Sequence, residues 1–203
     1  MSQFRGQPRQ QSVIIFDMDG TLTRPVLDFD AMRREIGIFD GSILESVLLM
    51  EPEERARAEA ILDRHERVAS ESSELQPDAE LIVHEMRSAG HPVVLMTRNS
   101  RTSLAAFQRR HAFEFDMTWT REDGPMKPSP EPVLLICRRF DADPREAVVI
   151  GDFHFDIMCG NAAGATTVLF LEPEMATPDW VGEAGHVIRR LLELRSILEL
   201  PAG

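Results

Sequence analysis

Four aspartates of this chain form two pairs whose spacing suits the binding of a divalent cation. Asp17 and Asp19 make one pair, Asp152 and Asp156 make the other, and each pair follows a short apolar run. If the four carboxylates meet in one pocket, they cannot all stay ionised without a positive counter-charge. Ligands that are all oxygen atoms indicate Mg²⁺ rather than Zn²⁺, and Mg²⁺ commonly pairs a few carboxylates with a substrate phosphate. These residues therefore predict a magnesium site beside a phosphoryl group.

The spacing of the first pair predicts a separate role for each aspartate. Side chains two residues apart at the end of a strand point to the same side. Asp17, at the strand end, is placed to attack a phosphorus atom and form an aspartyl-phosphate. Asp19 is placed to protonate the leaving alcohol and later to deprotonate the water that hydrolyses this intermediate. Gly20 lets the backbone turn away sharply after the pair.

Donors that suit a phosphoryl group occur at two further places in the chain. Lys127 is the only lysine among the 203 residues, and Thr97 offers a hydroxyl. Arg98 and Asn99 follow Thr97 directly and suit either substrate contact or capping of the next helix. Taken singly, a threonine before a helix or a lysine in a loop is an ordinary cap or surface residue. Considered with the aspartates, four residues are assigned to phosphate binding: Thr97, Arg98, Asn99 and Lys127.

Apolar runs alternate with helical patterns after residue 75, which indicates an α/β fold with a parallel, Rossmann-like sheet flanked by helices. Strands are expected at residues 13–16, 93–96, 147–150 and 166–171 and, more weakly, at 117–119. Helices are expected at residues 77–89, 100–111, 130–140, 156–163 and 187–198. The polar segments then follow or adjoin the carboxyl ends of strands, where open α/β sheets bind their ligands.

Residues 24–76 interrupt this alternation with an all-helical insertion. Helical patterns cover 28–36, 42–50 and 52–70. The charges of the last one, Glu66 among them, have the pattern of a solvated helix face. An insertion directly after the first strand predicts a small cap over the strand ends, with residues 1–23 and 77–203 as the α/β core. Three arginines of the insertion suit either a substrate carboxylate or plain surface charge: Arg24, Arg33 and Arg34.

Together these motifs resemble those of the haloacid dehalogenase superfamily of phosphohydrolases. The resemblance is to its phosphatase branch with a small helical cap of the first type, which includes phosphoglycolate phosphatase and β-phosphoglucomutase. The matching segments stand in the family order and extend over nearly the whole chain: Asp17-Met18-Asp19-Gly20-Thr21, Thr97, Lys127-Pro128, and Gly151-Asp152 with Asp156.

The resemblance implies a role for each matching residue. Asp17 would be the nucleophile and a magnesium ligand, and Asp19 would be the acid/base whose backbone carbonyl also binds the metal. The other roles fall to two pairs, metal binding to Asp152 and Asp156 and phosphoryl binding to Thr97 and Lys127. The insertion lies where family members carry their helical cap, although it is shorter than a usual four-helix cap.

Three other activities share parts of this pattern. A phosphomutase of the β-phosphoglucomutase type shares every core motif, so only cap contacts and kinetics separate it from a phosphatase. A haloacid dehalogenase lacks an acid at the position of Asp19 and needs no metal. A non-catalytic, phospho-accepting receiver module has adjacent acids, whereas Met18 separates the acids here. The pattern favours a Mg²⁺-dependent phosphatase acting on a small phosphorylated metabolite whose identity stays open.

The composition excludes several classes of partner. The 22 basic residues stand against 34 acidic ones, which gives a formal net charge of −12 and argues against binding of nucleic acid or an anionic membrane. Cys137 and Cys159 lie in apolar stretches, as is typical of buried, reduced thiols. No run has the length of a membrane span, and the first eleven residues lack the apolar core of a signal peptide. We expect a cytoplasmic monomer.

Overall fold

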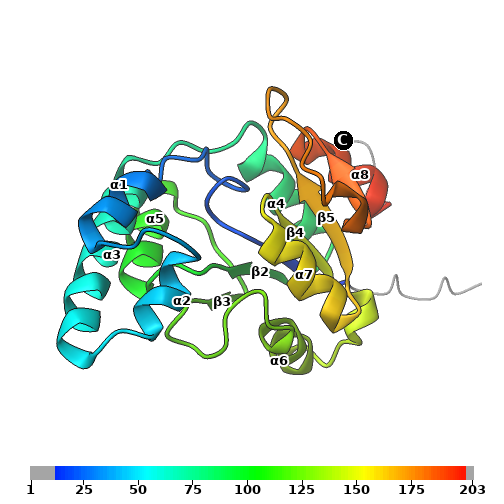
Figure 1. The fold of residues 1–203 in the computed structure, drawn as a ribbon. Helices are drawn as coiled ribbons and strands as arrows, with labels where there is room; N and C mark the ends of the chain where they lie inside the picture. Colours follow the sequence, from blue (N-terminus) through cyan, green and yellow to red (C-terminus); the bar gives the residue numbers. More distant parts are fainter. Residues whose placement is uncertain (1–11, 200–203) are drawn as a thin grey trace, which may run out of the picture.

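The computed structural model describes residues 12–199, which form an α/β core with a helical insertion (Figure 1). One six-stranded parallel sheet has the order β3-β2-β1-β4-β5-β6. Its strands are β1 (Ile14–Phe16), β2 (Val93–Met96), β3 (Met117–Trp119), β4 (Val148–Gly151), β5 (Thr166–Phe170) and β6 (His186–Ile188). The central β1 lies between β2 and β4, so the loops after these three strands open at the same edge of the sheet. The predicted fold class is confirmed.

Helices pack on both faces of the sheet because successive strand residues point to opposite faces. Ile14 and Phe16 belong to one buried cluster and Ile15 to another, each fully buried. Complete burial of such a side chain contributes roughly 1.5–3 kcal/mol. The first cluster includes residues of α4 (Ala79–Ser88), α5 (Arg101–His111) and α8 (Leu194–Ile197), and the second includes residues of α6 (Glu131–Arg139) and α7 (His154–Ala163). Within residues 12–199, no helix has the length and apolar character needed to cross a membrane.

The predicted terminal helix over residues 187–198 is wrong. The chain instead forms β6 beside β5, then a 3₁₀ helix at Leu191–Glu193 and the short α8. Val187 and Ile188 are β-branched, which favours a strand, and the edge of β5 supplies the backbone partners that a strand requires. The apolar spacing of this segment fits a helix equally well, so the pattern alone did not distinguish the two outcomes.

The insertion consists of α1 (Phe29–Ile36), α2 (Ile43–Leu48) and α3 (Pro52–Ser72). These helices share a small buried cluster of their own: Met32, Ile38, Ile43, Val47, Ala58 and Leu62. The chain leaves and returns at one place, since Thr23 pairs with Leu75 in an antiparallel bridge. The insertion after β1 is confirmed as a cap, whereas its division from the core at residues 23/24 and 76/77 stays a prediction.

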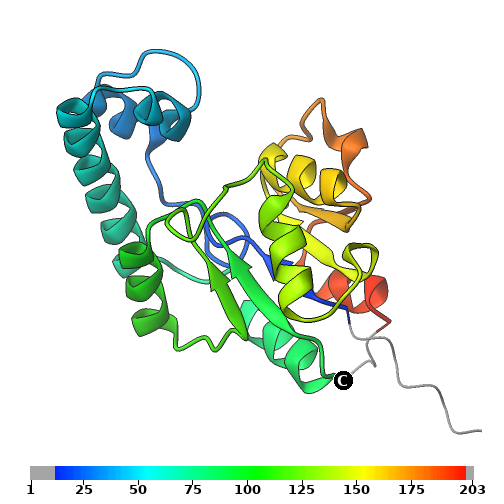
Figure 2. The same ribbon diagram turned by 90° about the horizontal axis from the view of Figure 1, so that it is seen from below.

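The cap is anchored to the core through its longest helix. Figure 2 shows α3 beside α5, and their contact includes a buried hydrogen bond of 2.7 Å between the hydroxyls of Ser70 and Ser103. The other cap helices, α1 and α2, pack on α3 rather than on the sheet. The cap therefore projects from one side of the core and extends toward the carboxyl ends of the strands.

Candidate active site

The loop after β1 brings the first acidic pair next to the second. Gly20 has φ +80°, a left-handed conformation that favours glycine. A Cβ atom at Gly20 would also lie 2.2 Å from Asp152 Oδ2, so a side chain here would displace that carboxylate. The hydroxyl of Thr21, which is fully buried, donates to Asp152 Oδ1 at 3.1 Å. This turn therefore positions an aspartate from the far half of the chain.

Three carboxylates converge at the ends of β1 and β4. Asp17, Asp152 and Asp156 each offer an oxygen, and these oxygens all lie within 4.8 Å of one another. Asp156 is placed by the start of α7, where the Phe153 backbone N–H donates to its Oδ2 at 3.2 Å. Gly151 leaves room for it, because a Cβ atom there would lie 2.1 Å from Asp156 Cγ. Such a group can hold a hard metal ion.

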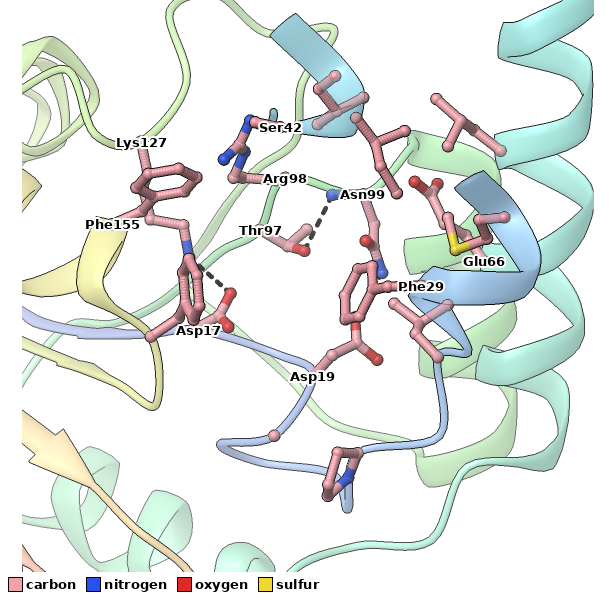
Figure 3. A pocket seen from close by; sticks show the side chains of 18 of the residues that line it. Asp17, Asp19, Phe29, Ser42, Glu66, Thr97, Arg98, Asn99, Lys127 and Phe155 are labelled. Carbon is pink, nitrogen blue, oxygen red and sulfur yellow. Dashed lines mark hydrogen bonds and ion pairs between the residues drawn. The ribbon is translucent and has the colours of Figure 1, made fainter. Parts of the chain in front are cut away.

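Lys127 lies within this acidic group. Its Nζ donates to Asp17 Oδ1 and to Asp156 Oδ1, both at 2.6 Å, and the residue is 4% exposed. Burial alone would lower the pKa of Lys127, but Asp156 and Asp17 raise it above its ordinary value. The lysine is therefore a fixed positive charge beside Asp17. Figure 3 shows the two side chains pointing toward each other.

Negative charge in the site exceeds what this ammonium can offset. Burial, with the charge of Asp17, raises the pKa of Asp19 from 3.8 to about 7. Burial raises the pKa of Asp156 to about 6 although Lys127 opposes the rise, and it raises the pKa of Asp152 well above its ordinary value. The surplus charge and the oxygen-only donors fit a divalent cation.

The loop after β2 faces the same site. The Thr97 hydroxyl accepts the Asn99 backbone N–H at 3.1 Å, which leaves its own proton free for a ligand. Asn99 Nδ2 donates to Asp19 Oδ2 at 2.5 Å. Ser100, rather than Thr97, caps α5, because its side chain accepts the Ser103 N–H at 3.1 Å. The alternative of Thr97 as a helix cap is therefore not observed.

Arg98 points from this loop toward the cap. Its Nη2 donates to Glu45 Oε1 of α2 at 2.6 Å, and its guanidinium carbon lies 4.5 Å from the centre of the Phe155 ring. In this structure Arg98 thus bridges cap and core, and Asn99 binds Asp19. Contact of either side chain with a substrate phosphate stays a prediction.

The prediction that Glu66 belongs to a solvated helix face is wrong. Glu66 is 3% exposed, and both of its carboxylate oxygens lie 2.6 Å from Arg121 Nη1. Its Oε2 also accepts the Ser100 backbone N–H at 3.1 Å. Burial raises the pKa of Glu66, and the charge and hydrogen bonds of Arg121 counter the rise. The sequence shows that residue 66 is charged. It does not show that the start of α5 and the loop that carries Arg121 cover this part of α3.

A pocket of about 600 Å³ lies between the cap and the strand ends. Every residue predicted to act on a metal or phosphate lines it: Asp17, Asp19, Thr97, Arg98, Asn99, Lys127, Asp152 and Asp156. Sequence reasoning missed the aromatic part of the wall, which consists of Phe29, Phe153 and Phe155. Two of these rings are adjacent in sequence to the second acidic pair, which was a usable signal. Nothing in the sequence marks the third, Phe29.

Comparisons with known proteins agree with this geometry. The family model for haloacid dehalogenase-like hydrolases matches residues 11–164. A haloacid dehalogenase-like hydrolase domain-containing protein of Arabidopsis thaliana is 32% identical over 92% of this chain and 83% of its own length. A phosphoglycolate phosphatase of Haemophilus influenzae is 28% identical over 54% of this chain and 53% of its own length.

A solved structure shares the fold across almost the whole chain. The crystal structure of a hydrolase from Pseudomonas syringae superposes with a TM-score of 0.76 at 21% identity, covering 94% of this chain and 98% of that one. The family match extends from the strand before Asp17 to the end of α7, the helix that contains Asp156, and so includes both acidic pairs. This chain belongs to the haloacid dehalogenase-like hydrolases, in the phosphatase-like branch that carries a helical cap after the first strand.

Proposed function

We propose that this protein is a Mg²⁺-dependent phosphatase that hydrolyses a small phosphorylated metabolite through an aspartyl-phosphate on Asp17. The observation that carries the proposal is the position of Asp17. Its carboxylate bonds to the buried ammonium of Lys127 and shares the end of the sheet with Asp152 and Asp156. A phosphoryl group at this place would meet a nucleophile and positive charge together.

In the first step, an oxygen of Asp17 attacks phosphorus, and the bond from phosphorus to the leaving oxygen breaks. Asp19 gives a proton to that oxygen, so the alcohol leaves neutral. Thr97 and Lys127 would donate hydrogen bonds to the phosphoryl oxygens as their charge is redistributed. The hydrogen bond from Asn99 holds the Asp19 carboxyl on the side of the pocket.

In the second step, water replaces the aspartate on phosphorus. Asp19, now without its proton, takes one from the water as the water oxygen attacks. The bond between phosphorus and Asp17 breaks, which restores the carboxylate and releases inorganic phosphate. The two half-reactions return Asp19 to its starting protonation state, so no other proton donor is required.

The residues that would hold Mg²⁺ are Asp17, Asp152 and Asp156, with the backbone carbonyl of Asp19. The cation supplies charge neutralisation between the phosphoryl group and the attacking carboxylate. The oxygen-only donor set and the raised pKa values of the buried carboxyl groups support this assignment. The Haemophilus relative, named as a phosphatase, supports the reaction class.

The test separates the two aspartates of the first pair. With p-nitrophenyl phosphate, whose leaving group needs little protonation, Asp19→Asn should complete the first step and stall at the second. We expect a burst of nitrophenolate and a protein that carries one acid-stable, hydroxylamine-labile phosphoryl group in rapid-quench mass spectrometry. Asp17→Asn should give neither, because no acyl phosphate can form.

An alkyl phosphate completes the design. Asp19→Asn should show no burst with it, since an alkoxide is a poor leaving group without a proton. Asp179→Asn is the matched control, because this aspartate is exposed and does not line the pocket. A phosphorylated Asp17→Asn protein would refute the assigned nucleophile. A phosphoenzyme that persists in the wild-type protein would indicate a phospho-accepting module instead.

A further inference from the structure

We propose that the substrate carries an apolar ring beyond its phosphoryl group, and that this ring binds between Phe29 of the cap and Phe153 and Phe155 of the core. The inference rests on the proposed function for the position of the phosphoryl group at Asp17. It goes further by naming the class of the substrate, a phosphate monoester whose leaving alcohol is hydrophobic and bears a ring.

The first argument is the exposure of aromatic side chains inside a pocket. Phe29 is 56% exposed and Phe153 is 55% exposed, yet both line the cavity that contains the acidic site. Phe153 meets Phe155 edge to face, with 5.1 Å between the ring centres. Exposed aromatic surface is stabilised when another apolar group covers it, and ring pairs add a preferred geometry. Figure 3 shows Phe29 and Phe155 on opposite sides of Thr97.

Much of the remaining cap wall is also apolar. Leu27, Ile43 and Leu44 line the cavity from the cap, and they belong to or pack on its apolar cluster. The volume of about 600 Å³ exceeds what a phosphoryl group with a two-carbon acid needs. It falls in the range of roughly 300–1,000 Å³ that is typical of pockets for larger organic ligands. The wall opposite the acidic site therefore favours a substrate that is apolar beyond its phosphoryl group.

The second argument concerns charge. A substrate with a second anionic group, such as a carboxylate, needs a cation at the far end of the pocket. Arg98 is bound to Glu45 and lies over the Phe155 ring. Arg33 donates to the backbone carbonyl of Gly41, and the acidic Asp30 lines the pocket from the same helix. The Nη2 of Arg98 and the Nη1 of Arg33 are engaged within the protein, so a carboxylate would have to compete for them; Arg98 Nε has no hydrogen-bond partner among the described residues but is buried.

The test measures binding rather than turnover. Three phosphonates share the phosphonate group and a three-carbon chain length: 3-phenylpropylphosphonate, propylphosphonate and 3-phosphonopropionate. They replace the ester oxygen of 2-phenylethyl phosphate, ethyl phosphate and phosphoglycolate by a methylene group. With Mg²⁺ present, titration calorimetry should give a Kd for the phenyl compound about tenfold lower than that for propylphosphonate. The carboxylate compound should bind no tighter than propylphosphonate.

Variants then locate the ring. Phe29→Ala and Phe153→Ala should each reduce the affinity ratio of the phenyl to the propyl compound several-fold, and both rings are exposed enough for the variants to fold. Phe39→Ala is the control, because this cap ring is 97% exposed and lies outside the pocket wall. Tightest binding of the carboxylate compound, equal affinities, or no binding of any compound would overturn the inference. A phenyl preference combined with failure of the phosphoenzyme test on Asp17 and Asp19 would retain it and refute the proposed function instead.

Discussion

The core wall of the pocket around Asp17 consists mainly of charged and polar side chains held by short bonds, whereas the cap wall consists mainly of apolar side chains and is joined by two aromatic rings of the core, Phe153 and Phe155. On the core side, Lys127 makes two 2.6 Å ion pairs, and the turn at Gly20 has no room for a side chain. On the cap side, Phe29 lies half-exposed at the start of α1. Preorganised charge stabilises a transition state, while apolar surface binds a substrate body without changing the reaction.

The difference assigns the reaction to the charged residues of the core, and the choice of substrate to the cap together with Phe153 and Phe155. A change among the charged residues of the core wall should lower the rate for every substrate. A change in the cap wall should alter the relative rates of different substrates or loosen the cap. The largest effects are therefore expected at the acidic site, and the smallest at the outer contacts between cap and core.

Removal of the metal should have the largest effect. With four buried or half-buried aspartates and one lysine at the site, EDTA should reduce phosphatase activity to background, and added Mg²⁺ should restore it. Ca²⁺ should not replace it, because its looser and higher coordination disturbs in-line geometry. Activity is measured as phosphate release. Full turnover in chelator would argue against a metal-dependent reaction.

Lys127→Ala should have the next largest effect, a loss of about 10²–10³ in kcat. The variant removes the charge next to Asp17, and no other lysine exists in the chain to replace it. Lys127→Arg should recover only part of the rate, because a planar guanidinium does not match a compact ammonium in a buried position. Circular dichroism checks that both variants fold. Near wild-type turnover in Lys127→Ala would exclude the lysine from the reaction.

The charged part of the core wall was predictable because its signals are local in sequence. Continuous apolar runs mark buried parallel strands, and a polar motif directly after each run must lie at the carboxyl edge of the sheet. This is why Asp17, Thr97 and Asp152 were placed together before any contact was known. Lys127 follows no strand directly, and it was identified by motif order and by being the only lysine.

The cap wall and the chain end were harder to predict because their structure depends on distant partners. The charge pattern of α3 shows which residues are polar but not which face packs on α5, so Glu66 was assigned to solvent. β6 is as short as β1 but lies at the edge of the sheet with only Ile188 buried, so it lacks the continuous apolar run that marks β1 and depends on pairing with β5. Phe29 has no neighbouring motif at all.

Glu66→Gln should destabilise the protein more than any other single change at the contact between cap and core. The substitution removes the shorter of the two ion pairs of Arg121, whose side chain is 14% exposed, and leaves only the 3.9 Å pair with the partly exposed Asp63. Loss of one member of a buried pair costs about 3–5 kcal/mol in the free energy of unfolding. Urea denaturation measures the loss. Glu59→Gln is the control on the same helix, because its partner Arg55 is exposed and the change should cost less than about 0.5 kcal/mol.

Glu45→Gln should have a much smaller effect than Glu66→Gln, although both residues join the cap to an arginine of the core. The Glu45 side chain is 45% exposed, so solvent screens its ion pair with Arg98, and the loss should stay below about 1 kcal/mol. Partial burial opposes ionisation, but hydrogen bonds from Ser42 and Arg98 lower the pKa of Glu45. Its contribution is therefore complete above the ordinary pKa of 4.5 and is lost as the pH falls through the lowered value.

The stability difference between wild type and Glu45→Gln should accordingly shrink between about pH 7 and about pH 3, and also in 1 M salt, where surface pairs are screened. Urea denaturation in both buffers measures it, with the folded fraction checked first at the lower pH. A loss as large as that of Glu66→Gln would mean that the cap is held as firmly at α2 as along α3. That result would mean that the outer part of the cap is held as firmly as the acidic site. The two walls would then no longer differ in rigidity.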